Sequence, residues 1–404
     1  MGIARLVLLG LLALGCGPGA ADEAAPLLPL HEVGPWPWTS SLVAYRDRLW
    51  LANSDRTRDC SCADLYSFDP AAGAIVYERH LFSQSVGRPI VHGGLLYWPY
   101  EDSRWNLGVA HVGVTDGERW RLLAIEYAQP LTHATAMASD GTTLWLATAN
   151  PGLRLFASRD GGLSWTARAG TPPREGLRWV LRAAPFAGGL YGIVIDGLRG
   201  RSRWLARIDT GRPERVADLP AGADALEVIV HDGRLLALAE VAGSGELWAS
   251  DGERSEPLGP GPPRGRLRDV ASDAEGRLWA LSLAPPGGLV WRRGDTGEWL
   301  LEARVEGGLP QELELVAGRP FVGGHADGGT GALWGAIGPG GEEPAPRAAL
   351  PEPGGRGGND WRALEARARA ALAEPGAYQE SARDARAALH ALARSAAPPA
   401  AFER

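Results

Sequence analysis

A segment of similar pattern recurs seven times along this chain, and it limits the possible folds more than any other feature. Each copy has a turn, an anchor residue, a large apolar residue and a short apolar run, as in RDRLWLA and EGRLWALS. The anchors lie 42 to 49 residues apart and are Leu49, Leu95, Leu144, Leu190, Leu235, Leu278 and Pro320. The next residues are all large and apolar: Trp50, Leu96, Trp145, Tyr191, Leu236, Trp279 and Phe321. This spacing predicts stacked repeat units with a shared core layer.

A second series of turns runs in phase with the first. Aspartate or glycine turns follow each copy, for example Asp69-Pro70 and Asp251-Gly252, and most separate two short runs of β character. Such turns indicate hairpins. Each unit then has four strands within about 45 residues, which is typical of a propeller blade. We therefore predict an all-β fold: a seven-bladed β-propeller of four-stranded antiparallel blades over residues 38–350. Six or eight blades are alternatives if an end unit is misread.

One of these turns has the sequence SRDGGLSW. It contains Ser158, Asp160, Gly161, Gly162 and Trp165, and it resembles the Asp-box of the BNR or sialidase-like β-propellers. The resemblance implies a peripheral structural turn, in which aspartate accepts backbone N–H groups and glycine permits the tight bend. It does not imply catalysis. The early Phe-Arg-Ile-Pro signature of sialidases is missing, and no residues can be assigned to their arginine triad or Tyr-Glu pair.

The first 16 residues are typical of an export signal. Arg5 precedes a short apolar run, and Ala13-Leu14-Gly15-Cys16 resembles a bacterial lipobox. This pattern predicts lipidation of Cys16, with residues 17–37 as a tether. The protein would then be a membrane-anchored lipoprotein of the bacterial cell envelope that faces the periplasm or the exterior. Cleavage near Ala21, which would give a soluble periplasmic or secreted protein, is the alternative.

Composition excludes several kinds of site. All 41 basic residues are arginine, so Schiff-base and P-loop lysines are absent, and the net charge of -7 gives no reason to expect nucleic acid. The other cysteines, Cys60 and Cys62, lie two residues apart in DCSCAD. A disulfide is our first interpretation, with free thiols or a soft-metal ligand pair as alternatives. We predict no metal centre and no cofactor.

After the propeller, residues 351–404 combine a Pro/Gly-rich hinge with two helix-forming stretches that end before Pro375 and Pro398. They predict a short C-terminal helical hairpin. It either packs on the propeller or forms a partner-binding tail, with Trp361 as the anchor in both cases.

Loops that follow the second strand of a blade converge on one face of a propeller, which is the usual binding face. The longest here belong to the first two units. We predict a ligand or partner rim formed by Arg56, Arg58, Glu101, Asp102, Arg104, Trp105, Asn106, Arg199, Arg201, His325 and Asp327. Trp105 and the arginines form its centre, because exposed aromatic and arginine side chains are common at interface hot spots. Alternatively, Trp105 folds back onto its own unit.

Together these features predict an exported, lipid-anchored propeller that binds an unknown protein or glycan at its loop-rich face without catalysis. The membrane is contacted only through the lipid. The alternative function is a carbohydrate-active hydrolase or lyase of sialidase-like architecture. No catalytic residue can be assigned.

Overall fold

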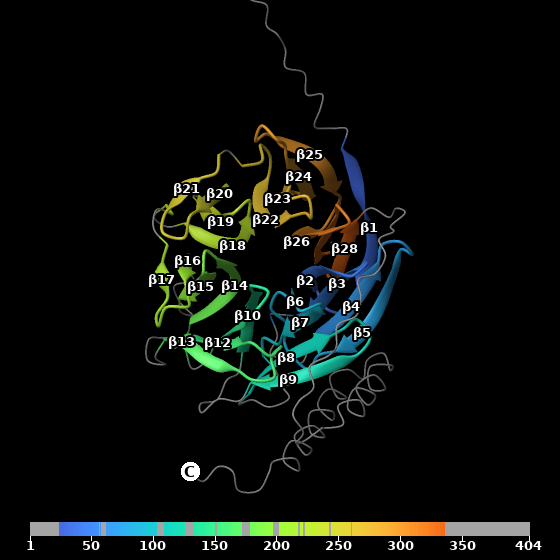
Figure 1. Cartoon of the computed structure of the whole chain (residues 1–404). Helices are drawn as coiled ribbons and strands as arrows, with labels where there is room; N and C mark the ends of the chain where they lie inside the picture. The colour runs from blue at the N-terminus through green and yellow to red at the C-terminus, as the bar shows by residue number, and fades with distance from the viewer. Residues whose placement is uncertain are drawn as a thin grey trace, which may run out of the picture.

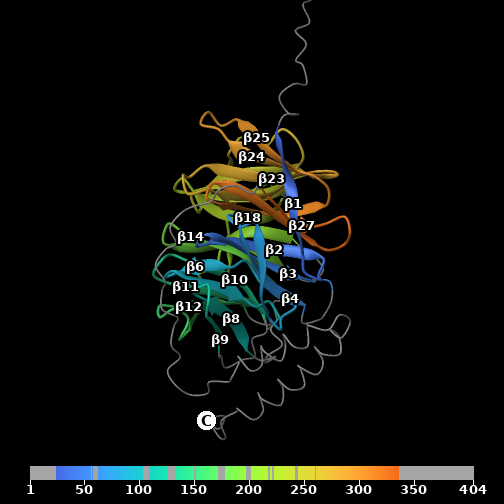
Figure 2. The same ribbon diagram turned by 90° about the vertical axis from the view of Figure 1, so that its right-hand side faces the viewer.

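The computed structural model describes residues 24–55, 57, 62–102, 109–125, 133–149, 152–171, 178–196, 202–216, 219–220, 223–241, 244–259 and 261–335. These residues form 28 strands and no helix. The sheets follow one another around a central axis in chain order, as Figure 1 shows along the axis and Figure 2 from the side. The repeat pattern thus predicted the all-β propeller fold correctly.

Five sheets are separate and antiparallel, and each is made of four consecutive strands. The first two contain β2 (Trp38–Tyr45), β3 (Arg48–Ser54), β4 (Ala63–Asp69) and β5 (Ala74–His80), then β6 (Ile90–His92), β7 (Leu95–Pro99), β8 (Ala110–Thr115) and β9 (Trp120–Ile125). The next two contain β10 (His133–Ser139), β11 (Leu144–Ala149), β12 (Arg154–Ser158) and β13 (Thr166–Gly170), then β14 (Arg178–Phe186), β15 (Gly189–Asp196), β16 (Ser202–Arg207) and β17 (Glu214–Arg215). The fifth contains β18 (Asp224–His231), β19 (Arg234–Val241), β20 (Ser244–Ser250) and β21 (Ser255–Pro257).

The remaining strands form one eight-stranded sheet in the order β22-β23-β24-β25-β1-β28-β27-β26. Its strands are β1 (Ala25–Val33), β22 (Arg266–Ser272), β23 (Leu278–Ala284), β24 (Gly287–Arg293), β25 (Trp299–Val305), β26 (Leu309–Val316), β27 (Arg319–His325) and β28 (Gly331–Gly335). The first strand of the chain, β1, joins the two halves of this sheet. It pairs antiparallel with β28 through five residue pairs and parallel with β25 through three.

The prediction of seven separate blades is therefore wrong in that form. The structure has five separate four-stranded sheets, and the strands of the last two predicted units belong to the eight-stranded sheet. The difference arises because residues 25–33, which lie within the predicted tether, form β1 and hydrogen-bond to both units. The predicted C-terminal helical hairpin lies outside the described residues, as do the export signal and Cys16.

The apolar repeat forms the core between sheets. All six anchor leucines are buried, and so are six of the seven large apolar residues that follow the anchors. Trp145 is the exception, because it is only partly buried against the neighbouring cluster. The prediction of a shared core layer is thus confirmed at nearly every position.

The turns between third and fourth strands begin with aspartates that bind backbone N–H groups. Asp69 accepts from Ala71, and Asp251 accepts from Glu253, each at 2.9 Å. In the SRDGGLSW turn, Asp160 accepts the N–H of Ser164 at 2.9 Å, and Ser158 accepts that of Gly162 at 2.8 Å. Gly161 and Gly162 have φ of 69° and 90°, which glycine adopts without strain. Trp165 packs against the core cluster beneath this turn.

Candidate functional site

The innermost strands bring charged side chains to the axis of the propeller. The pairing of β14, β18, β22 and β26 with their neighbours shifts at one place, immediately before Arg182, Glu227, Asp269 and Glu312 respectively. Such bulges re-aim the adjacent side chains. Figure 1 shows these four strands nearest the centre of the ring.

Ion pairs connect these residues across the axis. Arg182 pairs with Glu227 at 2.8 Å and with Glu312 at 3.3 Å. Arg88, which precedes β6, pairs with the same Glu227 at 3.1 Å and with Glu314 at 3.9 Å. Arg182 and Glu227 belong to neighbouring sheets, whereas the other three pairs join sheets that are not neighbours in the ring. We call these residues, together with Asp269, the axial cluster.

Backbone N–H groups hold the carboxylates of the axial cluster as well. Asp269 accepts from Val270 at 2.9 Å and from Leu313, in the next strand group, at 2.8 Å. Glu312 accepts the N–H of Leu42 in β2 at 3.2 Å. The cluster therefore connects the first sheet with the last strands of the ring.

Burial raises the pKa values of two acids near the axis. Desolvation, reinforced by the negative charge of Glu227, raises the pKa of Asp269 to about 7. Desolvation also raises the pKa of Glu314 to about 7, although Arg88 opposes this shift. Burial alone would lower the pKa of Arg182, but Glu227 and Glu312 raise it, so the guanidinium stays charged. The cluster can thus take up protons near neutral pH while its arginines remain cations.

The axial cluster differs from a sialidase centre, in which arginines face an incoming carboxylate. Arg88 and Arg182 are bound to carboxylates of the protein itself. A third arginine, Arg268, donates to the side chain of Gln311, and burial lowers its pKa. Arg88 and Arg182 are therefore compensated by carboxylates of the protein, whereas Arg268 donates to a neutral amide and its buried Nε has no hydrogen-bond partner among the described residues. Sequence reasoning missed this cluster, although a signal exists: Arg182, Glu227, Asp269 and Glu312 each lie eight or nine residues before an anchor.

Four residues of the predicted rim lie in the described part of the chain. The backbone oxygen of Glu101 accepts a hydrogen bond from His133 Nδ1 at 2.6 Å, and the backbone N–H of Asp102 donates to Ser83 Oγ at 3.2 Å. His325 is in β27, 5.1 Å from the ring of Trp38, and Asp327 accepts the N–H of Gly308 at 3.0 Å. These are local contacts in two different parts of the ring. Outside the described residues lie Arg56, Arg58, Arg104, Trp105, Asn106, Arg199 and Arg201, so the rim as a whole stays a prediction.

The cysteine region forms a buried polar group in the first sheet. Cys62 is disulfide-bonded; Cys60 lies outside the described residues, so the pairing of the two stays a prediction. Nearby, the Asp64 carboxylate binds His80 Nδ1 at 2.8 Å and accepts Nε1–H of Trp36 at 2.9 Å. All three side chains are buried. These contacts secure the start of β4 and the end of β5. Among the described residues, no three histidine, cysteine or acidic side chains are arranged to hold a metal.

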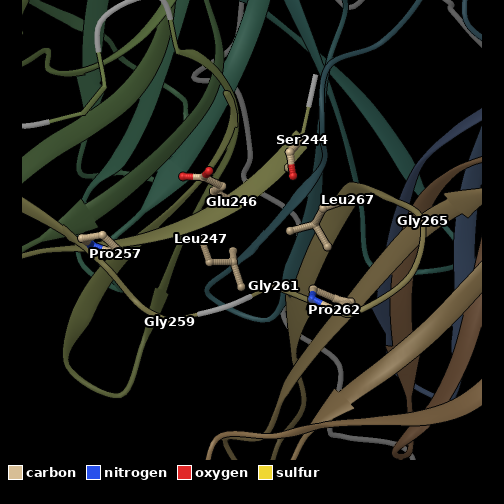
Figure 3. A pocket seen from close by; sticks show the side chains of 10 residues that line it. Ser244, Glu246, Leu247, Pro257, Gly259, Gly261, Pro262, Gly265 and Leu267 are labelled. Atoms are coloured by element: carbon tan, nitrogen blue, oxygen red, sulfur yellow. The ribbon is translucent and has the colours of Figure 1, made fainter. Parts of the chain in front are cut away.

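A groove lies beside the outer edge of β20, and we call it the β20 groove. Its volume is about 350 Å³. The lining residues are Ser244, Gly245, Glu246, Leu247, Pro257, Gly259, Gly261, Pro262, Gly265 and Leu267. Figure 3 shows β20 on one side and the Pro257–Gly265 connection on the other. No signal in the sequence marked this site, because an open strand edge is a property of the backbone.

Comparison with known proteins supports a propeller of a different family from the one the Asp-box suggested. The family model described as outer membrane protein assembly factor BamB matches residues 37–178, which is less than half of the chain. The resemblance to Asp-box, sialidase-like propellers is therefore wrong as a family assignment. The aspartate turn misled because an aspartate that accepts backbone N–H groups is not specific to the motif: Asp69 and Asp251 also accept them, from residues two and three positions later, where the motif is absent.

Solved structures share the fold. A streptogramin B lyase has a TM-score of 0.54 at 11% identity, covering 77% of this chain and 97% of that one. A catalytically inactive virginiamycin B lyase from Staphylococcus aureus with quinupristin has a TM-score of 0.56 at 10% identity, covering 77% and 99%. A xyloglucanase from Xanthomonas campestris has a TM-score of 0.52 at 16% identity, covering 77% and 53%. No curated protein matches in sequence. At these identities the comparisons establish that the chain has a β-propeller fold.

Proposed function

We propose that this protein is a non-catalytic β-propeller of the cell envelope that binds a protein partner. The observation that carries the proposal is the match of residues 37–178 to the BamB family model. That family is described as an assembly factor of outer membrane proteins, a role that implies contact with other proteins. The negative net charge of this chain is consistent with a protein partner rather than nucleic acid.

The axial cluster supports a scaffold role. Arg88 and Arg182 bind carboxylates of three different side chains across the axis, so their charge is used to connect sheets. Ion pairs with both partners in place stabilise a buried arrangement, whereas loss of one partner is costly. The centre of the ring would then act as a brace, and partner binding would use the loops and strand edges outside it.

We also propose that the eight-stranded sheet works as two four-stranded blades, β22–β25 and β26–β28 with β1, which gives seven units in the ring. The longer pairing of β1 is with β28, through five residue pairs, and the three pairs with β25 join the neighbouring unit. Each half then has four strands, as in the other sheets.

We propose that the protein reaches the envelope through its first 16 residues and is anchored by lipid on Cys16. Each acyl CH₂ buried in the bilayer contributes about 0.8 kcal/mol, so several chains hold a protein firmly. We expect Cys16→Ser to move the protein from the membrane to the soluble exported fraction on centrifugation. Mass spectrometry showing an unmodified mature terminus near Asp22 in the unaltered protein would reject the anchor.

Site-specific photocrosslinking in the native envelope tests the partner. A photoreactive residue is placed at one exposed position in each sheet, for example at Val76, Val91 or Val230. A discrete protein adduct that forms from one arc of the ring supports the proposal. Adducts from no position, or equally from all positions, would contradict it.

A further inference from the structure

An aromatic pair lies where the eight-stranded sheet meets the first sheet. The ring centroid of Trp38, at the start of β2, is 5.1 Å from that of His325, at the end of β27. His325 is the register partner of Leu309, the first residue of β26, so their side chains lie on the same face of the sheet. Trp38 and His325 are partly buried, and Leu309 is 41% exposed. The three side chains therefore form a partly exposed apolar group at the end of the ring where β27 finishes.

The polar atoms of the aromatic pair are not used inside the fold. Nε1 of Trp38 and the two ring nitrogens of His325 have no hydrogen bond to a described residue. None of these atoms is buried without a partner, in contrast to Nε1 of Trp98 and of Trp248. They are therefore accessible to solvent, where they can contact a bound group.

Two acidic residues lie beside the aromatic pair. Asp327 is in the turn after β27, and its Oδ1 accepts the N–H of Gly308, the residue before β26, at 3.0 Å. A Cβ at Gly307 would be 3.0 Å from Oδ2 of the same carboxylate, so the chain from Glu306 to Gly308 passes along it. Glu306 and Asp327 are exposed, and neither forms an ion pair with any residue that the structure describes.

These residues combine aromatic surface with unpaired negative charge. We call them the Trp38 patch, which consists of Trp38, Glu306, Leu309, His325 and Asp327. Another acid of the same sheet, Glu302, is paired with Arg292 at 2.7 Å. An indole face attracts a cation, and a guanidinium can stack on it while its N–H groups bond to carboxylates. The patch is therefore complementary in shape and charge to an arginine side chain.

We infer that the Trp38 patch binds an arginine side chain of a protein partner, with the guanidinium on the exposed part of the Trp38 indole and beside the carboxylates of Asp327 and Glu306. Leu309 would contact the apolar stem of the same side chain. This inference rests on the proposed partner-binding function, and it names the surface that performs it and the residue that is recognised.

The first test uses the full-length protein labelled with 5-fluorotryptophan and followed by fluorine NMR, in which Trp38→Phe assigns the Trp38 resonance. The probes are N-acetyl-arginine amide and N-acetyl-citrulline amide, which has a neutral group in place of the guanidinium. We expect the Trp38 resonance to shift saturably with the arginine compound. The citrulline compound should bind about two- to fivefold more weakly, as expected for exposed charge contacts. No shift of this resonance, or equal binding of the two compounds, would overturn the inference.

Two variants test the carboxylates in the same titration. Glu306→Gln and Asp327→Asn should each weaken binding of the arginine compound about two- to fivefold. Both should stay folded, because Glu306 has no ion pair to lose within the described residues and an asparagine oxygen can still accept the Gly308 N–H. Asp47→Asn is the matched control, because it makes the same charge change in the exposed turn at the other end of β2. An equal effect of all three variants would also overturn the inference.

The crosslinking experiment in the native envelope tests the patch against a real partner. A photoreactive residue at Leu309 should form a protein adduct, and mass spectrometry should place an arginine of the partner next to the attachment site. Val230 is the matched control, because it is also 41% exposed but lies near the end of β18, whereas Leu309 begins β26. Asp327→Asn should lower the yield of the Leu309 adduct.

The outcomes at these positions separate the inference from the proposed function. If adducts arise only from Val76, Val91 or Val230, the inference about the Trp38 patch fails and the proposed function stands. If no position gives an adduct, both fail. A Leu309 adduct without an arginine at the attachment site, or one to a later segment of the same chain, would also overturn the inference.

Discussion

At the scale of single residues, the stability of the axial cluster depends strongly on Glu227. Its carboxylate is buried and pairs with Arg88 and Arg182, and its other oxygen accepts the Val228 N–H at 3.0 Å. A neutral side chain at this position leaves the positive charges of two arginines near the axis with less negative charge to balance them. The contribution of each charged residue here therefore depends on the presence of its partners.

We expect Glu227→Gln to lower the free energy of unfolding by about 3 kcal/mol, because it breaks a buried ion-pair group from one side. Chemical denaturation followed by tryptophan fluorescence measures the change. Glu253→Gln, in an exposed turn, is the control and should change stability by less than about 0.5 kcal/mol. If the two variants have equal stability, the axial cluster does not brace the ring.

Asp160 is a second test at this scale. Asp160→Ala removes the acceptor of the Ser164 N–H and should cost about 1 kcal/mol of stability. Asp47→Ala, at an exposed turn position, serves as the control. Partner binding, corrected for the folded fraction, should not change. A tenfold loss of affinity in folded protein would instead place the aspartate turn in the binding site.

At the scale of elements, β1 has adjacent residues that differ strongly in burial. Leu27 is 3% exposed and packs in a core cluster, whereas its neighbour Leu28 is 58% exposed. Alternate residues of a strand point to opposite faces, so one substitution probes the core and the next probes the surface. The two positions therefore form a matched pair.

Leu27→Ala should lower the free energy of unfolding by about 3 kcal/mol through lost burial and a residual cavity. Leu28→Ala should change it by less than about 0.5 kcal/mol. Denaturant midpoints of the two variants, compared with the unaltered protein, provide the measurement. Similar midpoints for both would mean that β1 is not an integral strand of the ring.

The elements also show what the sequence could predict. Anchors such as Leu49 and Leu235 predicted the second strands, because apolar residues at a fixed repeat distance must pack between units. β1 could not be found in this way, since it is a single strand outside the repeat and its partners β25 and β28 lie far along the chain. The axial cluster was missed because the bulges decide where Arg182 and Glu227 point, and the regular spacing of these residues before their anchors does not by itself show that direction. The β20 groove was missed for a similar backbone reason.

At the scale of the whole molecule, the protonation of the axial cluster links stability to pH. The folded-state pKa values of Asp269 and Glu314 are raised to about 7, above the unfolded values of about 4. Stability from these groups is therefore fully present below pH 4 and is lost as the pH rises through 7. Buried His111 acts in the opposite direction at lower pH, since burial lowers its pKa to about 4. Its stabilising effect is complete above about pH 6.5, the ordinary histidine pKa.

We therefore expect the melting temperature to fall between about pH 7 and 8, where His111 is mostly neutral in both states. The charged residues that act on the two acids are Arg88, Glu227 and Glu312. Asp269→Asn should flatten the decline. A melting temperature that rises steadily from pH 7 to 8 would contradict the raised acidic pKa values.

The position of β1 in the ring affects the order in which the strands can pair as the protein folds. β1 is the first described strand that a ribosome or an export channel releases, yet its antiparallel partner, β28, is the last. Sheets made of consecutive strands can form as they emerge, but β1 must wait until Gly335 is available. The first strand to emerge is thus among the last to complete its pairing. A chain interrupted before β28 would contain all five separate sheets, and the edge of β1 that pairs with β28 would still be unpaired.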